Sequence, residues 1–258
     1  MLTAILLSPV LFLARRVPLR VASAGAWGVA ALWWFVLPIR RGVAVSNLSR
    51  ALPELSARPV LIRMMHDLVL NFVEALQFSR LTITLEGFEP VGNAVLLGGH
   101  GGNWEAMLYA LGERSATAIF LRTPSNVWVA ARMAELRAAH RVIALETGAT
   151  MDDGLAEVAR GASLIFVQDQ KHRGGMMTPF FNVPAPTSAA FAAAAARAGR
   201  PAFAFWQWRE GVGRHRARVW PIDTSGSVEE VTAAANRFYE DRIREHPHGW
   251  LWLHRRWG

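Results

Sequence analysis

The segment of residues 94–105, AVLLGGHGGNWE, holds the residues best suited to chemistry. Its apolar start predicts a buried strand, and the glycines after it let the chain turn tightly and let a substrate approach His100. Asn103 is a good N-cap for a helix whose first turn carries Glu105. Because open α/β sheets bind ligands at the carboxyl ends of their strands, His100 is a candidate catalytic residue.

His100 and Glu105 are predicted to act as a general base and its orienting carboxylate. On one continuous helix, two residues five positions apart diverge by about 140°. With the histidine in the loop and the glutamate in the first turn, the two can meet, and one ring nitrogen stays basic. Such a base typically contributes about 100- to 10,000-fold to a rate. The alternative is that His100 is only a turn residue whose side chain forms hydrogen bonds with the backbone.

Other kinds of site fit this segment poorly. No Gly-x-Ser-x-Gly occurs in the chain, so a serine hydrolase would lack its nucleophile. His-x4-Glu is not a helical pair of zinc ligands, and Trp104 stands where a dinucleotide fingerprint needs its third glycine. The chain contains no cysteine, which excludes thiolate metal sites, disulfides and cysteine nucleophiles. We therefore expect neither a metal nor a cofactor.

The elements around this segment alternate between short β-rich runs and longer helical patterns. This alternation predicts an α/β fold with a mostly parallel central sheet and helices on both faces. Strands are expected at 81–86, 94–97, 116–121, 142–145, 164–167, 202–208 and 217–222. Helices are expected at 43–52, 59–81, 104–112, 127–139, 152–160, 185–198 and 228–246. Nothing divides residues 41–258, so they are predicted to form one catalytic domain.

Residues 1–40 are predicted to be a membrane anchor or a set of interfacial helices. Residues 21–39 carry no charge and are flanked by Arg20 and Arg40. A helix from residue 21 to the breaker Pro38 would be about 25 Å long, slightly short of a hydrocarbon core of about 30 Å. We therefore favour a helical hairpin or interfacial anchor over a single span or a buried core helix. Arginines follow the first apolar run, so a cleaved signal peptide is not expected.

The whole composition excludes a disordered chain and indicates an anionic partner. Hydrophobic residues make up 52% of the chain and charged residues 19%. The net charge is +8, and Lys171 is the one lysine among 28 basic residues. Arginine together with 11 tryptophans suits contact with anionic lipid or phosphate, although a GC-rich genome also favours arginine. The arginines are scattered and no nucleic-acid motif occurs, so no nucleic-acid partner is expected.

Five ordered blocks of this sequence resemble the bacterial lipid A late acyltransferase family, the lauroyl and myristoyl transferases of the lysophospholipid-acyltransferase-like superfamily. The blocks are NLSRALPEL at 47–55, HGGNWE at 100–105, RTPSN at 122–126, VQDQ at 167–170 with TPFFNVPA at 178–185, and HPHGWLWLHRRW at 246–257. The chain departs from the family pattern where Gln168 replaces a proline, Asn182 a glycine, and His248 with Gly249 a Glu-Gln pair.

The resemblance implies a membrane-associated acyltransferase with a glycerolipid acyltransferase-like fold. The donor would be an acyl carrier protein or coenzyme A thioester. The acceptor would be a lipid hydroxyl, with a lipid A precursor as the first choice. This activity belongs to lipopolysaccharide biosynthesis, at the cytoplasmic face of the bacterial inner membrane.

The resemblance also implies roles for individual residues. His100 would take the hydroxyl proton, Glu105 would stabilise the imidazolium, and amides around Trp104 would hold the oxyanion without an acyl-enzyme. The remaining candidates are substrate-binding residues, and they are Arg122, Asn126, Asp169 and Gln170. Arg122 suits a phosphate but also a surface ion pair, and Asn126 suits either substrate or a helix cap.

The sequence is also compatible with two other functions. A thioesterase or lipid hydrolase would use the same His/Glu pair to activate water, and it would need no acceptor. A peripheral module that binds membrane or nucleic acid would cluster its basic residues on one face, and its binding would fall steeply with salt.

Overall fold

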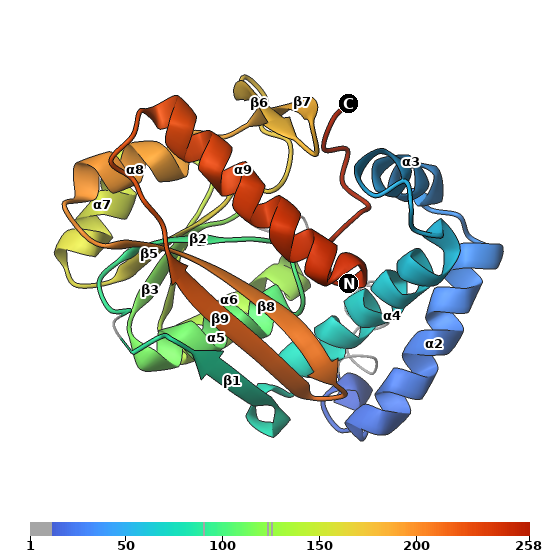
Figure 1. The fold of residues 1–258 in the computed structure, drawn as a ribbon. Helices are drawn as coiled ribbons and strands as arrows, with labels where there is room; N and C mark the ends of the chain where they lie inside the picture. Colours follow the sequence, from blue (N-terminus) through green and yellow to red (C-terminus); the bar gives the residue numbers. More distant parts are fainter. Residues whose placement is uncertain (1–11, 90, 123, 125) are drawn as a thin grey trace.

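A seven-stranded sheet forms the centre of the protein (Figure 1). The computed structural model describes residues 12–258 apart from 90, 123 and 125, so most of the apolar run 2–14 lies outside the described residues. The strands are β1 (Thr82–Glu86), β2 (Val95–Gly98), β3 (Thr117–Phe120), β4 (Val142–Leu145), β5 (Ser163–Val167), β8 (Ala202–Gly211) and β9 (Arg214–Pro221). Their order is β1-β9-β8-β2-β5-β3-β4, and every pair is parallel except the β8–β9 hairpin. The predicted mostly parallel sheet is confirmed.

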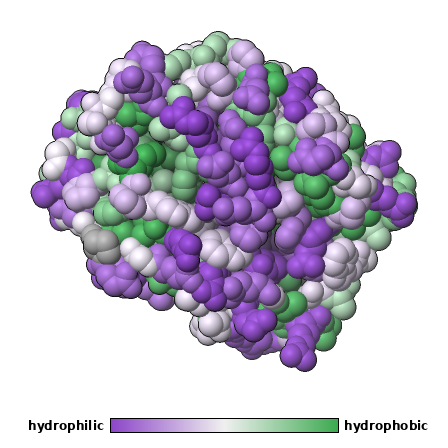
Figure 2. Space-filling model, viewed as in Figure 1, coloured by the Kyte–Doolittle hydropathy of each residue, from purple (hydrophilic) through white to green (hydrophobic). Residues whose placement is uncertain are grey.

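Helices cover both faces of this sheet. Side chains alternate along each strand, so Val95 and Leu97 of β2 join one buried cluster while Leu96 joins the other. The first cluster includes residues of α7 (Met151–Ala159), α8 (Ala190–Ala198) and α9 (Val228–Glu245). The second lies under α5 (Trp104–Arg114) and α6 (Val127–Ala139). Figure 2 shows hydrophilic residues across the centre of the α9 side of the molecule, with hydrophobic residues in separate patches.

The helices α2 (Leu19–Phe35), α3 (Arg41–Ala51) and α4 (Ala57–Leu76) precede the sheet in the described part of the chain. α2 lies along α4 and buries the small residues Ser23, Ala26 and Ala30, while Leu32 and Phe35 are exposed (Figure 1). Among the described residues, no helix combines the length and the apolar character needed to cross a membrane. The predicted helix 59–81 ends earlier, and a 3₁₀ turn, η1 (Phe78–Arg80), follows it.

The structure corrects one part of the predicted order of elements. Residues 185–187 are not helical but end a hairpin of β6 (Met176–Phe180) and β7 (Val183–Thr187), so α8 begins at Ala190. Phe181 and Asn182 have φ of 51° and 59°, as a two-residue hairpin turn requires. Both strands contain proline, which is tolerated here because a two-stranded sheet has free edges where an N–H can be missing.

Candidate active site

The structure joins His100 to Asp169 at the carboxyl ends of two neighbouring strands. β2 and β5 are parallel, and their last paired residues are Gly98 and Val167. His100 and Asp169 each follow two positions later, so they lie side by side. The Nδ1 atom of His100 is 2.9 Å from Asp169 Oδ1, and the His100 backbone N–H donates to Oδ2 at 2.9 Å. The indole N–H of Trp250 also donates to Oδ2, at 2.7 Å.

Asp169 is ionised in this environment, although it is fully buried. Burial raises the pKa of its carboxyl, but the charge and hydrogen bonds of His100 and the hydrogen bond from Trp250 outweigh burial and hold the pKa below its usual value. A carboxylate beside Nδ1 favours the tautomer in which Nδ1 carries the proton. Nε2 is then the basic nitrogen, and it makes no hydrogen bond to any described residue. The His100 side chain is 25% exposed, so a substrate can reach it.

Glu105 is not the carboxylate that His100 contacts. The Glu105 carboxylate instead pairs with Arg137 of α6 through two hydrogen bonds of 2.8 and 3.0 Å. The hydroxyl of Tyr109 donates to the same carboxylate at 3.1 Å. The predicted contact between His100 and Glu105 is therefore replaced by one between His100 and Asp169, because the first turn of α5 directs Glu105 toward α6. A catalytic role for Glu105 stays a prediction.

The loop that carries His100 depends on glycine at several positions. A Cβ at Gly99 would lie 2.5 Å from Cζ3 of Trp206. Gly102 has φ of +53°, and a Cβ there would lie 2.8 Å from the carbonyl oxygen of Gln207. The loop therefore lies directly on β8, with no room for side chains on that side.

Side chains from three other elements hold the carbonyl groups of this loop. The donors are the hydroxyl of Tyr239 to Gly98 O (2.7 Å), Gln207 Nε2 to Gly99 O (3.1 Å) and Gly101 O (2.5 Å), and Asn71 Nδ2 to Gly102 O (2.7 Å). These residues lie on α9, β8 and α4. Because they lie far apart in the sequence, the position of His100 depends on the assembled fold.

A buried carboxylate, Glu74 of α4, connects this loop to the hairpin of β8 and β9. It accepts hydrogen bonds from Arg209, from His215 and, at 3.2 Å, from the side chain of Asn103. Burial raises the pKa of Glu74, but the bonds and charges of His215 and Arg209 lower it to about 2. Glu74 is thus a charged anchor for the N-cap of α5.

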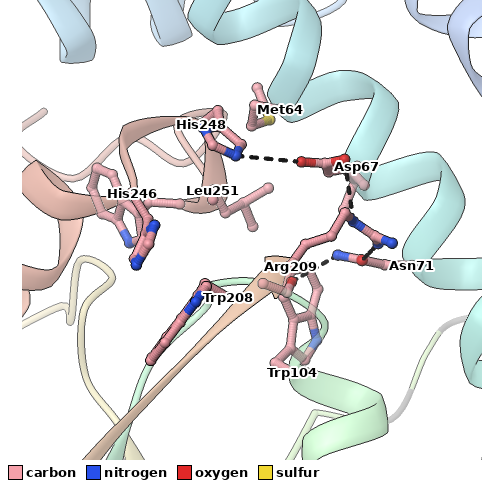
Figure 3. Close-up of a pocket in the computed structure, with 13 residues that line it drawn as sticks. Met64, Asp67, Asn71, Trp104, Trp208, Arg209, His246, His248 and Leu251 are labelled. Atoms are coloured by element: carbon pink, nitrogen blue, oxygen red, sulfur yellow. Dashed lines mark hydrogen bonds and ion pairs between the residues drawn. The ribbon is translucent and has the colours of Figure 1, made fainter. Parts of the chain in front are cut away.

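Gly102 also lines a pocket, shown in Figure 3, in which Arg209 lies between Asp67 and Asn71. His248 points toward Asp67, with 4.0 Å between Nε2 and Oδ2. The free volume is about 20 Å³, enough for about one water molecule. Arg209 donates to Asn71, whose side chain in turn holds the loop at Gly102 O.

Two larger cavities meet at His100. The first, the Arg122 cavity, measures about 330 Å³ and includes Trp104, Glu105, Arg122, Arg137 and Gln207 in its wall. The second, the Gln168 cavity, measures about 440 Å³ and includes Met151, Gln168, Gln170, Lys171, His172 and Ser188. His100, Phe120, Ile165 and Val167 line both. His100 is therefore open to a cavity on each of two sides.

A third cavity, mostly apolar, adjoins the Arg122 cavity. This α4–α6 cavity measures about 190 Å³, and it shares Trp104, Glu105 and Met133 with its neighbour. Its apolar wall comes from α4, α5 and α6, and it includes Leu68, Phe72, Ala75, Leu76 and Leu136. Phe72 is exposed, so this cavity has an apolar residue at the protein surface.

Several of the predicted site residues lie in the walls of these cavities. Arg122 is exposed in the wall of the Arg122 cavity, and Gln170 lies in the wall of the Gln168 cavity. Asn126 caps α6, because its side-chain oxygen accepts the Val129 N–H at 3.2 Å. Among the described residues, no group of three or more His, Asp or Glu side chains is placed to hold a metal ion.

Sequence reasoning missed Arg137, Gln207 and Trp250. Trp250 lies in the C-terminal block that resembles the family motif, so this block could have indicated it. Arg137 and Gln207 lie in an ordinary helix and an ordinary strand, with no sequence signal.

The sequence matches a known protein family. The family model described as "Bacterial lipid A biosynthesis acyltransferase" matches residues 82–258. No curated protein sequence matches the chain. Among solved structures, the chain is similar to the 1-acyl-sn-glycerophosphate (LPA) acyltransferase PlsC from Thermotoga maritima, with a TM-score of 0.39 and 13% identity. That similarity covers 80% of this chain and 96% of the other.

Proposed function

This chain belongs to the family of bacterial lipid A biosynthesis acyltransferases and is an acyltransferase, and from this premise we propose that it transfers a fatty acyl chain from a thioester to a lipid hydroxyl. The donor is an acyl carrier protein or coenzyme A thioester, and the acceptor is a lipid A precursor. The observation that carries this proposal is the pairing of His100 with the ionised Asp169 where two cavities meet.

The His100–Asp169 pair supports general-base catalysis with direct transfer. Nε2 of His100 removes the hydroxyl proton as the acceptor oxygen attacks the thioester carbonyl. The tetrahedral intermediate then expels the thiolate, which takes the proton back from the imidazolium. Asp169 stabilises the imidazolium in between. The amides of Trp104 and Glu105 begin α5 and have no acceptor among the described residues, so they suit the oxyanion.

The cavities suggest places for the donor. Arg122 is proposed to bind the phosphate of the donor's pantetheine arm, because a guanidinium offers paired donors. The hydrocarbon chain is proposed to enter the α4–α6 cavity, whose wall is mostly apolar. A Leu136→Trp variant, which fills this cavity, should then lose more activity with long acyl donors than with short ones. An equal loss at all chain lengths would contradict this placement.

The test of the reaction is incubation with an acyl thioester, first alone and then with a lipid A precursor. We expect thiol release that depends on the acceptor, together with a product heavier by one acyl chain in mass spectrometry. Thiol release without acceptor, at the same rate, would favour the thioesterase or lipid hydrolase. The His100→Ala variant should lose transfer and keep the fold, as measured by circular dichroism.

The second part of the proposal is attachment to the inner membrane at its cytoplasmic face through residues of α2 and the loop after it. The exposed apolar side chains there are Val21, Trp27, Val29, Leu32, Phe35, Val36, Leu37 and Ile39. Arginines at positions 15, 16, 20 and 40 are exposed beside them. An apolar surface bordered by arginine suits the interface of an anionic bilayer.

Sedimentation with lipid vesicles tests this attachment. We expect the protein to bind vesicles that contain anionic lipid and to bind less at high salt. Leu37→Asp should weaken binding, whereas Met177→Asp, which places the same charge on exposed β6, should not. Equal weakening by both variants would exclude α2 and its loop as the specific contact.

A further inference from the structure

Gln168 carries a hydrogen-bond donor that has no acceptor in the described part of the chain. The residue is 3% exposed, and its side chain lines the Gln168 cavity beside His100. Its Oε1 accepts the backbone N–H of Phe191 at 3.4 Å. Its Nε2 is buried and has no partner among the described residues. A buried amide N–H without an acceptor costs free energy. A bound ligand that accepts this hydrogen bond would account for the buried Gln168 side chain.

The surroundings of this amide favour a negatively charged ligand. α8 begins at the cavity, and the positive end of its dipole is directed there. Ser188 accepts the Ala190 N–H, which leaves its own hydroxyl hydrogen available as a donor. Lys171 and His172 complete the polar wall, and none of the lining residues, all within the described chain, is Asp or Glu.

We infer that the Gln168 cavity is a binding site for a substrate's phosphate group, with the Gln168 amide as a donor that determines specificity. The inference rests on the proposed acyl transfer, because the cavity shares His100 with the Arg122 cavity. Apolar side chains in the same wall, including Phe120, Met151 and Phe166, suit the organic part of a phosphate ester.

Calorimetric titration with phenyl phosphate tests the site without any reaction. The wild-type protein should bind phenyl phosphate in preference to phenol. Gln168→Glu keeps an acceptor for Phe191 but replaces the donor with a negative charge, so the Kd should rise by about tenfold or more. Lys171→Met should also raise the Kd and provides a second variant if Gln168→Glu does not fold. Arg173→Ala, which removes an exposed neighbouring cation outside the cavity wall, should leave the Kd within about twofold.

The same variants reveal which substrate carries the phosphate. The kcat/KM loss of Gln168→Glu should disappear with a dephosphorylated acceptor if the cavity binds the acceptor phosphate. It should disappear with an N-acetylcysteamine thioester, which has no phosphate, if the cavity binds the donor phosphate. A loss that persists with both substrates, or an unchanged Kd for phenyl phosphate, would overturn the inference. A wild-type protein that binds phenyl phosphate but transfers no acyl chain would refute the proposed reaction and leave the phosphate site standing.

Discussion

The Nδ1 atom of His100 lies 2.9 Å from Oδ1 of Asp169, although 69 positions separate the two residues. Two neighbouring parallel strands place them side by side, and the backbone N–H of His100 donates to the same carboxylate. The contact favours the tautomer in which Nε2 carries no proton, as the proposed general-base role requires.

The roles of the two carboxylates can be separated by matched amide substitutions. Asp169→Asn should lower kcat by about a thousandfold, because an amide can donate to Nδ1 and so favours the unproductive tautomer. Glu105→Gln should stay within about tenfold of wild type, because it disturbs only the contacts with Arg137 and Tyr109. Steady-state kinetics with saturating acceptor measures both. A larger loss of kcat for Glu105→Gln than for Asp169→Asn would indicate that Glu105 orients His100.

Replacing Trp250 by Phe should shift the pH dependence of activity. Trp250 lowers the pKa of Asp169 by hydrogen bonding, so its removal raises that pKa. In the proposed mechanism activity requires ionised Asp169, so the acidic limb of the rate profile should move to higher pH. Trp252→Phe is the control, because that indole donates instead to Pro247 O. An identical shift in both variants would mean that packing, and not the hydrogen bond, is responsible.

Arg137→Met should destabilise the protein, because it leaves the Glu105 carboxylate largely buried without its charged partner. Loss of one partner from such a pair typically costs about 3–5 kcal/mol in the free energy of unfolding. Arg132→Met, on the same helix, breaks a pair with the exposed Glu135 and should cost less than about 1 kcal/mol. Urea denaturation measures both. Similar costs would show that the Glu105 pair behaves as a surface contact.

Glu74 should make stability depend on pH in the acidic range. Its pKa falls from 4.5 to about 2 on folding, so the unfolded chain binds the proton more readily. The contribution of Glu74 is therefore complete above pH 4.5 and is lost as the pH falls through about 2. Denaturation of wild type and Glu74→Gln across this range should show a difference that shrinks with acidity. A difference that stays constant would contradict a charged Glu74.

Gly102→Ala should destabilise the loop that carries His100. The residue has φ of +53°, and the new Cβ would lie 2.8 Å from Gln207 O. Backbone strain and this close contact should together lower the free energy of unfolding by about 1–3 kcal/mol. Gly42→Ala, at an open position in α3, should instead be neutral or stabilising. Thermal unfolding compares the two. A neutral Gly102→Ala would mean that the loop can move away from β8.

Local patterns were sufficient to predict the elements that position His100. The apolar run before it, the glycines around it and the Asn103 cap act within a few residues of one another. The predicted strand and helix at this point therefore agree with β2 and α5. The β6–β7 hairpin was not predicted, because its prolines are read as breakers until the free edges of the pair are known.

The sequence by itself determined where the candidate base lies, a histidine in a glycine-rich turn at the end of a strand, because turn and cap preferences act over short distances. Only the tertiary structure decided which carboxylate contacts that histidine. Glu105 is five residues away and Asp169 is 69, yet strand order places Asp169 against the ring and the first turn of α5 directs Glu105 toward Arg137. Proximity in the sequence predicts a contact only where the backbone between two residues directs their side chains together. Here the parallel register of β2 and β5 brings the distant Asp169 to His100 instead.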